Sequence, residues 1–430
     1  MKKKLLTILP AICLLTGCGK ETAGMSMTDS SSSAVSAETS QNGTTASSGE
    51  EETSSQTTTM KVSTDVPDDA YINTLAEAEV YDKLTVADIV TDTNGTLING
   101  DDEVDTSKTG ETEISVIFEY DGKNYEKKVT MSVQDTTPPL ILNNGWSPYV
   151  QQNTEFDLET LVGYADNYDR KPKLTYTGSV DTSAIGTYPI TATVTDSSGN
   201  SESWNMSVVV VSEIPYPEDN EPRTSFEDYI SRYGNENTTL GIDVSVWQGD
   251  IDFDAVKAAG CEFVIIRMGY YYDEITMDEC FLNNIEKAQA AGLKTGVYFY
   301  TTDNSVEGIK EHAKWIAENL DGRKLDFPVA FDWEEFTNFQ EFGMNIKDLN
   351  DLFELFCDEM ESYGYSGMLY SSKNFLNNFW TNEGEHMVWL AHFIDETDYT
   401  GDYSMWQASC TGNIPGIYGD VDVDILYKNK

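Results

Sequence analysis

The sequence predicts a mixed α/β protein in which two small β-sandwich domains precede an irregular (β/α), TIM-like barrel. Three observations support this fold class. The 430 residues are too many for one ordinary domain. Short alternating strands and turns repeat through residues 61–212. From residue 235 the pattern changes to apolar strands alternating with helices, which is typical of a parallel sheet covered by helices.

Residues 1–18 have the pattern of an export signal. Residues 2–4 are lysines, and the apolar run over residues 5–15 is too short to span a bilayer. The run ends in Leu15-Thr16-Gly17-Cys18, which resembles a bacterial lipobox. The resemblance implies that Cys18 is lipidated, and we therefore expect an anchor on the extracellular face of the cell membrane. An ordinary secretory signal with a chance cysteine is the alternative.

Residues 19–60 are rich in Ser, Thr, Gly and Glu and hold almost nothing to bury, which predicts a disordered linker. An internal repeat follows in residues 61–135 and 136–212. Val-Asp-Thr-Ser occurs at 104–107 and again at 180–183, and residues 84–90 match residues 156–162. A unit of about 75 residues with short strands is typical of a small β-sandwich. Both copies resemble bacterial immunoglobulin-like (Ig-like) domains, and we interpret them as spacers or wall-contact domains.

Turn signals mark each copy of the repeat. Asp121-Gly122 and Ser197-Ser198-Gly199 separate pairs of alternating strands and predict hairpins. Pro138 and Pro139 are expected to stiffen the joint between the copies. The run from Asp166 to Asp169 clusters carboxylates that suit Ca²⁺, but a solvated turn is the simpler interpretation. We therefore predict no metal and no cofactor.

The net charge of the chain limits the kinds of partner that it can bind. The chain has 27 Lys and Arg against 74 Asp and Glu, a formal net charge of −47. Nucleic-acid binding requires basic surfaces, so nucleic acid is excluded as a partner, and we expect a soluble monomer.

The four cysteines outside the signal lack the Cys-x-x-Cys spacing of metal or redox motifs. The sequence is compatible with disulfides and with buried thiols at these four positions. They are Cys261, Cys280, Cys357 and Cys410.

Residues 213–234 form a Pro- and Glu-rich linker, and residues 235–430 are expected to form the barrel. Gly292 is expected to end the second helix in the left-handed conformation. Asn304-x-x-Glu307 resembles a capping box at the start of the third. Strands are expected at 242–246, 263–268, 295–300, 328–331, 367–370, 388–393, 405–408 and 421–426, and helices at 253–259, 278–291, 305–319 and 349–363.

Acidic residues stand at the ends of expected strands, where the functional residues of such barrels lie. Asp243 is on the first strand, Asp332 and Glu334 end the central strand, and Asp422 is near the last. Because strand side chains alternate, Asp332 and Glu334 point the same way with Cα atoms roughly 6.5 Å apart. Two such carboxyls cannot both ionise freely, so one pKa is raised. Glycosidic cleavage requires this combination, although a solvated strand end is also compatible with it.

The segments around Asp243, Asp332 and Asp422, in their order and spacing, resemble glycoside hydrolase family 25, the N-acetylmuramidases. Residues 290–298, 389–392, 406–407 and 412–416 match as well, so the resemblance covers residues 238–430. It implies cleavage of the β-1,4 bond between N-acetylmuramic acid and N-acetylglucosamine in peptidoglycan glycan strands, within the cell wall. It also implies that Glu334 is the general acid and that the other three carboxylates shape and charge the site. Substrate contacts are expected from Tyr298, Tyr370, Trp389, Trp406 and Gln407, with core packing as the alternative for each aromatic.

Two segments depart from the family pattern. Phe299-Tyr300 stands where many members have a His-Phe pair, and Arg267-Met268-Gly269-Tyr270 replaces a Lys-Ala type ending. Neither touches the acidic set. The role of Asp332 stays open between nucleophile, base and support for the substrate's own 2-acetamido group, which we favour by analogy.

Two other functions compete with catalysis by this acidic set. The first is a non-catalytic lipoprotein that binds cell-wall saccharides on the same barrel. The second is a Cys or Ser peptidase, but none of His312, His386 and His392 stands in a nucleophile–base motif.

Overall fold

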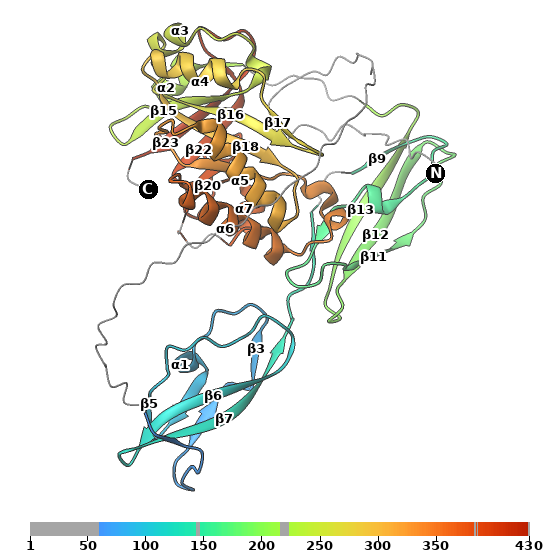
Figure 1. Ribbon diagram of the computed structural model, residues 1–430. Helices are drawn as coiled ribbons and strands as arrows, with labels where there is room; N and C mark the ends of the chain where they lie inside the picture. Colours follow the sequence, from blue (N-terminus) through green and yellow to red (C-terminus); the bar gives the residue numbers. More distant parts are fainter. Residues whose placement is uncertain (1–59, 143–146, 216–222, 382–383, 385, 429–430) are drawn as a thin grey trace, which may run out of the picture. The chain divides into compact units, whose positions relative to one another are not determined.

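A computed structural model describes residues 60–142, 147–215, 223–381, 384 and 386–428. The chain divides into two compact units, with the boundary between Thr136 and Thr137 (Figure 1). The expected lipidation site Cys18 lies outside the described residues. Among the residues that are described, no helix has both the length and the apolar character needed to cross a membrane.

The first unit is built around a long antiparallel hairpin. Strands β6 (Gly110–Tyr120) and β7 (Lys123–Gln134) pair along their whole length. Asp121 and Gly122 both have positive φ, 49° and 72°, as a type I′ turn requires. The expected hairpin is therefore confirmed. The smaller elements are β1 (Val62–Ser63), β2 (Ile72–Thr74), β3 (Glu77–Glu79), α1 (Val86–Ile89), β4 (Val90–Thr93) and β5 (Thr96–Leu97).

The second unit begins with another small β domain, which we call the second Ig-like domain (residues 137–215). Strands β12 (Gly186–Thr195) and β13 (Ser201–Val211) form the expected hairpin. They stand between β11 (Lys173–Gly178) and β9 (Tyr149–Gln151) in a four-stranded sheet. A separate pair is formed by β8 (Leu140–Ile141) and β10 (Tyr164–Ala165), and η1 (Leu158–Thr160) is a single 3-10 turn.

The internal repeat is visible in the local structure of both copies. Asp105 Oδ1 accepts hydrogen bonds from the backbone N–H (3.0 Å) and hydroxyl (2.6 Å) of Ser107. Asp181 Oδ1 accepts the same two bonds, at the same distances, from Ser183. The matched upstream segments each form one helical turn, α1 and η1. The repeated residues therefore build the same turns in both domains.

The rest of the second unit is a closed β-barrel with helices on its outside (Figure 1). Neighbouring strands from β15 to β22 are parallel. In order the barrel strands are β15 (Thr238–Val244), β16 (Phe263–Tyr271), β18 (Lys294–Thr301), β19 (Val329–Asp332), β20 (Gly367–Ser372), β21 (Met387–Ala391), β22 (Met405–Asn413) and β23 (Val421–Tyr427), with β14 (Thr224–Ser225) and β17 (Ile275–Met277) paired to their edges. The helical elements are α2 (Phe226–Tyr233), η2 (Val246–Gln248), α3 (Phe253–Ala258), α4 (Phe281–Ala290), α5 (Val306–Leu320), η3 (Phe336–Phe342), α6 (Ile346–Ser362) and α7 (Lys373–Asn378).

The expectation of a wholly parallel sheet is wrong at its last strand. Strand β23 runs antiparallel to both β22 and β15 and closes the barrel between them. Residues 414–420 join β22 to β23 without a helix. A parallel connection needs a crossover of a dozen residues or more, so this short link permits only an antiparallel neighbour.

Barrel strands are buried on both faces, which explains their continuous apolar runs. On β16, Phe263 and Ile265 belong to a cluster of strand residues inside the barrel. Their neighbours Val264 and Ile266 belong to a larger cluster shared with the helices.

One of the two expected helix-end signals is confirmed. Gly292 follows α4 with φ of 75°, the left-handed conformation expected of it. The capping box from Asn304 to Glu307 is wrong. Ser305 caps α5 instead, accepting from the Gly308 N–H at 3.1 Å. Gly308 stands where a capping box needs a Glu or Gln side chain, so the reciprocal bond cannot form.

Cys261, Cys280 and Cys357 are thiols and not disulfides in this structure. Burial raises the pKa of the Cys261 thiol to about 12 and keeps it neutral. Its Sγ donates to the Phe263 carbonyl at 3.1 Å. These cysteines therefore act as packing residues.

Candidate active site

The four predicted acidic residues come together at one end of the barrel. Asp243 on β15 lies directly opposite Asp422 on β23 in the antiparallel ladder, so the two side chains share a face. Asp332 ends β19, where it pairs with Tyr300 and Tyr370 on the neighbouring strands. Glu334 follows two residues later. Segments that are far apart in the chain thus place their carboxyl groups at the same end of the barrel.

Burial dominates the electrostatics of these carboxyls. Asp243, Asp332 and Asp422 are 5%, 4% and 6% exposed. Loss of solvent raises the pKa of Asp243 to about 7, although the hydrogen bond from Gln407 opposes the rise. Burial and the charge of Asp243 raise the pKa of Asp332 to about 8, against the opposing charge of Arg267. The cluster therefore holds protons at neutral pH.

Glu334 has the environment of a carboxyl group that stays protonated at neutral pH. Burial raises its pKa well above the ordinary range, and the charges of Asp332 and Glu335 add to the effect. Within the described chain, Glu334 Oε2 and Asp332 Oδ1 are shielded from solvent and have no hydrogen-bond partner. A buried acid without a protein acceptor can donate its proton to a substrate that enters the site.

A chain of hydrogen bonds orients Asp243. Gln407 Nε2 donates to Asp243 Oδ2 at 2.7 Å, and the Tyr370 hydroxyl donates to Gln407 Oε1 at 2.8 Å. These bonds fix which end of the Gln407 amide faces the carboxylate. Gln407 and Tyr370 therefore lie beside the acidic cluster, and both are buried. That they contact a substrate stays a prediction.

The predicted aromatic residues separate into two groups. Trp389 packs against Tyr370 and Tyr298 inside the barrel, with ring centroids 4.6 and 6.2 Å apart. Trp406 belongs to the outer core, where its Nε1 donates to the His392 carbonyl at 2.8 Å. The structure therefore does not bring Trp406 to the other predicted contacts. Because it precedes the inward-facing Gln407 on one strand, alternation turns it outward.

Sequence reasoning missed two residues of the site. Asp424 is fully buried and accepts a hydrogen bond from Trp389 Nε1 at 2.8 Å. Burial, then the charges of Asp243 and Asp422, raise its pKa well above the ordinary range. The alternating acidic run at 420, 422 and 424 carried this signal. Arg267, noted only as a departure from the family pattern, pairs through Nε with Asp278 Oδ2 at 2.8 Å and supplies positive charge beside Asp332.

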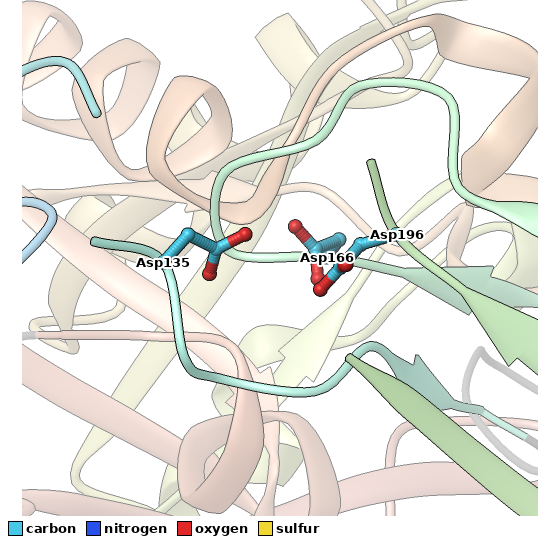
Figure 2. A group of neighbouring side chains, drawn as sticks. All are labelled: Asp135, Asp166 and Asp196. Atoms are coloured by element: carbon cyan, nitrogen blue, oxygen red, sulfur yellow. The ribbon is translucent and has the colours of Figure 1, made fainter. Parts of the chain in front are cut away.

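A second group of carboxyls consists of Asp135, Asp166 and Asp196. One oxygen of each lies within 4.8 Å of the others, and all three residues are buried (Figure 2). Asp166 and Asp196 each accept two backbone N–H groups from the turns that follow them. The expectation of a solvated turn at Asp166 is wrong, because its carboxylate is an internal acceptor with no exposed surface. That no metal binds here stays a prediction.

Comparison with known proteins identifies both domains of the second unit. Residues 242–417 match the family model described as glycosyl hydrolases family 25. The barrel is therefore similar to glycosyl hydrolases family 25 over most of its length. Residues 141–210 match the model of the bacterial surface protein Ig-like domain.

The curated relatives that match the family 25 domain are lysozymes. The chain is 29% identical over 188 residues to the autolytic lysozyme of Clostridium acetobutylicum, covering 43% of this chain and 54% of the relative. It is 28% identical over 197 residues to lysozyme M1 of Streptomyces globisporus, covering 42% and 65%. The chain thus spans less than two thirds of each relative. Among solved structures, a bacterial lysozyme from Streptomyces coelicolor is similar at 24% identity with a TM-score of 0.38, over 44% of this chain and 92% of that one.

The family 25 match covers only part of the acidic cluster. Asp243, Asp332 and Glu334 lie inside the matched range, and Asp422 and Asp424 lie beyond its end. The pairing of β15 with β23 nevertheless places Asp422 opposite Asp243. The two aspartates of β23 therefore belong to the cluster by geometry.

Proposed function

We propose that this chain is a peptidoglycan hydrolase that cleaves the β-1,4 bond between N-acetylmuramic acid and N-acetylglucosamine. The observation that carries the proposal is the buried acidic cluster around Glu334, which keeps a carboxylic acid protonated at neutral pH beside further carboxyls. The similarity of the barrel to family 25 and lysozymes as relatives support the substrate class.

In this proposal Glu334 protonates the glycosidic oxygen as the bond breaks. Its raised pKa keeps it protonated at neutral pH, as a general acid requires. Developing positive charge on the sugar is stabilised by whichever neighbouring carboxyls are ionised. Asp243, whose pKa is raised only to about 7, is partly ionised at neutral pH and supplies this negative charge.

The role proposed for Asp332 is support of the substrate's own 2-acetamido group as the nucleophile. Asp332 ends β19 two residues before the acid, close enough for its charge to affect the pKa of Glu334. The mixture of anomers formed early in the reaction tests this role, because inversion contradicts it.

The finer features of the proposal concern fold and location. We propose that the barrel is an irregular TIM-like one and that residues 61–135 form a first Ig-like domain.

We propose that Tyr298, Tyr370 and Gln407 contact the sugar and that Trp389 packs behind them. The chain is exported and held at the membrane by lipid on Cys18, and a Cys18→Ser variant is expected in the medium and not in the membrane fraction.

Digestion of purified peptidoglycan tests the function. Mass spectrometry of the fragments should show N-acetylmuramic acid at the new reducing ends. Glu334→Gln should reduce kcat by roughly 10²- to 10⁴-fold, because the amide donates no acid proton. Glu361→Gln, an exposed position in α6, is the matched control and should leave the rate unchanged. Equal rates for the wild type and Glu334→Gln would overturn the assignment, and binding without cleavage would point to a saccharide receptor.

A further inference from the structure

The segment after the catalytic acid joins Glu334 to helix α6. We call residues 335–348 the acid loop; it contains η3 and the first turn of α6. The Phe336 N–H donates to the Glu334 carbonyl at 2.7 Å. Phe336 and Phe339 pack edge-on against Trp333, with ring centroids 5.1 and 5.6 Å apart. The position of η3 therefore sets the position of the backbone on both sides of Glu334.

The second Ig-like domain touches η3 backbone to backbone. A Cβ placed on Gly163 would lie 2.5 Å from the Thr337 carbonyl oxygen and 2.8 Å from that of Phe336. Real Cβ atoms are not found this close to backbone atoms. Glycine at this position is therefore required by space.

The side-chain amide of Gln340, on the acid loop, forms hydrogen bonds with the same edge of the second Ig-like domain. Gln340 Oε1 accepts from the Tyr164 N–H at 3.3 Å. Its Nε2 donates to the carbonyls of Glu159 (3.2 Å) and Val162 (3.3 Å). One side chain thus satisfies three backbone groups of the other domain, which fixes the register between them.

The far end of the acid loop is also held by the Ig-like domain. The Ile346 N–H, in the first turn of α6, donates to the Asp166 carbonyl at 2.8 Å. Such N–H groups have no partner inside a helix, so the domain completes the helix end. Arg170 forms two hydrogen bonds with Asp348, at 2.6 and 2.7 Å. Asp348 in turn closes the capping box of α6 with Asn345.

Apolar contacts connect these two polar regions. Ala165 on β10 is 2% exposed and belongs to the hydrophobic core of the barrel. Leu140 and Leu142 pack against the same core. The contact is thus a continuous, partly apolar interface and differs from a flexible attachment.

We propose that the second Ig-like domain is a positioning element of the active site, which holds the acid loop at both ends and so fixes Glu334. This inference rests on the proposed function. It assigns the domain a part in the chemistry in addition to any role as a spacer, although none of its residues touches the reacting atoms. Gly163 and Gln340 are the positioning residues through which it acts.

The first test is Gly163→Val in the full chain, with Gly186→Val as the matched control. A Cβ on Gly186, in the same domain, meets its nearest atom at 3.6 Å, so the same substitution fits there. Gly163→Val should lower kcat roughly 10- to 100-fold with little change in KM, as expected for a small displacement of a catalytic group. The basic limb of the pH–rate profile should move to lower pH, because a loosened acid loop exposes Glu334 and lowers its pKa. The control should match the wild type in both respects.

The second test is Gln340→Ala, which removes three hydrogen bonds without a clash and carries the test if Gly163→Val fails to fold. Amide hydrogen exchange over residues 335–348 should be faster than in the wild type, and kcat should fall together with the same shift of the pH profile. Faster exchange with an unchanged kcat and pH profile overturns the inference and leaves the domain as an attachment. A wild type that releases no reducing ends overturns the proposed function instead, and the exchange result separates the two failures.

Discussion

At the scale of single residues, the acidic cluster shares its protons among several carboxyls. Asp243, Asp332 and Glu334 each have a raised pKa, and the charge of Asp243 contributes to the rise at both Asp332 and Glu334. The pKa values measured for such a cluster belong to the group and not to one member. The chemistry therefore depends on how many protons the cluster holds at a given pH.

Stability should depend on pH because of these protons. The pKa values of Asp243 and Asp332 rise from 3.8 in the unfolded reference to about 7 and about 8. The folded state binds these protons more tightly than the unfolded state does. Their stabilising contribution is therefore complete below about pH 4 and is lost gradually as the pH rises from about 4 through 7 to 8. We expect the free energy of unfolding to fall over this range, by at most about 1.4 kcal/mol per pH unit for each retained proton.

Denaturant unfolding of the full chain at successive pH values measures this slope. Asp243→Asn should make it shallower, because the amide does not titrate. Asp254→Asn, at an exposed position on α3, is the control and should leave the slope unchanged. A slope that is the same in all three proteins contradicts the prediction.

Single residues also show what a sequence can and cannot reveal about the site. Asp243, Asp332 and Glu334 were predictable because their strand ends are clear in the apolar pattern. Trp406 and Gln407 were both expected in the site, although neighbours on one strand face opposite sides. Asp424 was missed because only the strand pairing shows that the whole alternating run on β23 faces the barrel interior.

At the scale of elements, most barrel strands and helices lie within a few residues of their predicted positions. Their signals are local: apolar runs for buried strands and glycine after a helix. The direction of β23 was not predictable from its own residues, because it depends on the length of the link that precedes it. The cap of α5 was misplaced by one residue, since Asn304 and Ser305 are both good capping residues.

Replacing the cap of α5 tests the corrected assignment. Ser305→Ala should lower the free energy of unfolding by about 1 kcal/mol, because the Gly308 N–H loses its acceptor. Thermal or denaturant unfolding measures the change. Ser362→Ala, whose hydroxyl only bonds back to the Glu359 carbonyl of its own helix, is the control and should have a smaller effect. Equal effects would argue against capping by Ser305.

At the scale of the whole molecule, the largest difference from expectation is the second Ig-like domain. The repeat predicted it as a copy of the preceding domain, and its local turns match that copy. Its contacts with the acid loop are absent from any local pattern, because Gly163 and Gln340 are far apart in the chain and neither belongs to a distinctive sequence motif. Contacts of this kind follow from the assembled fold alone.

The net charge of −47 also acts at this scale. Bacterial walls are themselves anionic, so charge repels the protein from its proposed substrate, and added salt screens this repulsion. We expect the rate on whole walls to rise from low to moderate ionic strength. A short, soluble glycan fragment, which carries only a few charges, is the control substrate, and its cleavage should respond little. Falling rates on whole walls contradict this prediction.

The antiparallel closure by β23 has a consequence for when the protein becomes active. Asp243 and Asp422 pair directly although about 180 residues separate them, and such distant contacts form late in folding. Chains are made from the N-terminus, so Asp243, Asp332 and Glu334 all exist before the strand that completes the cluster. An unfinished chain therefore contains its acid without the surroundings that tune it. The acidic cluster is therefore complete only after β23 has been synthesised and has paired with β15.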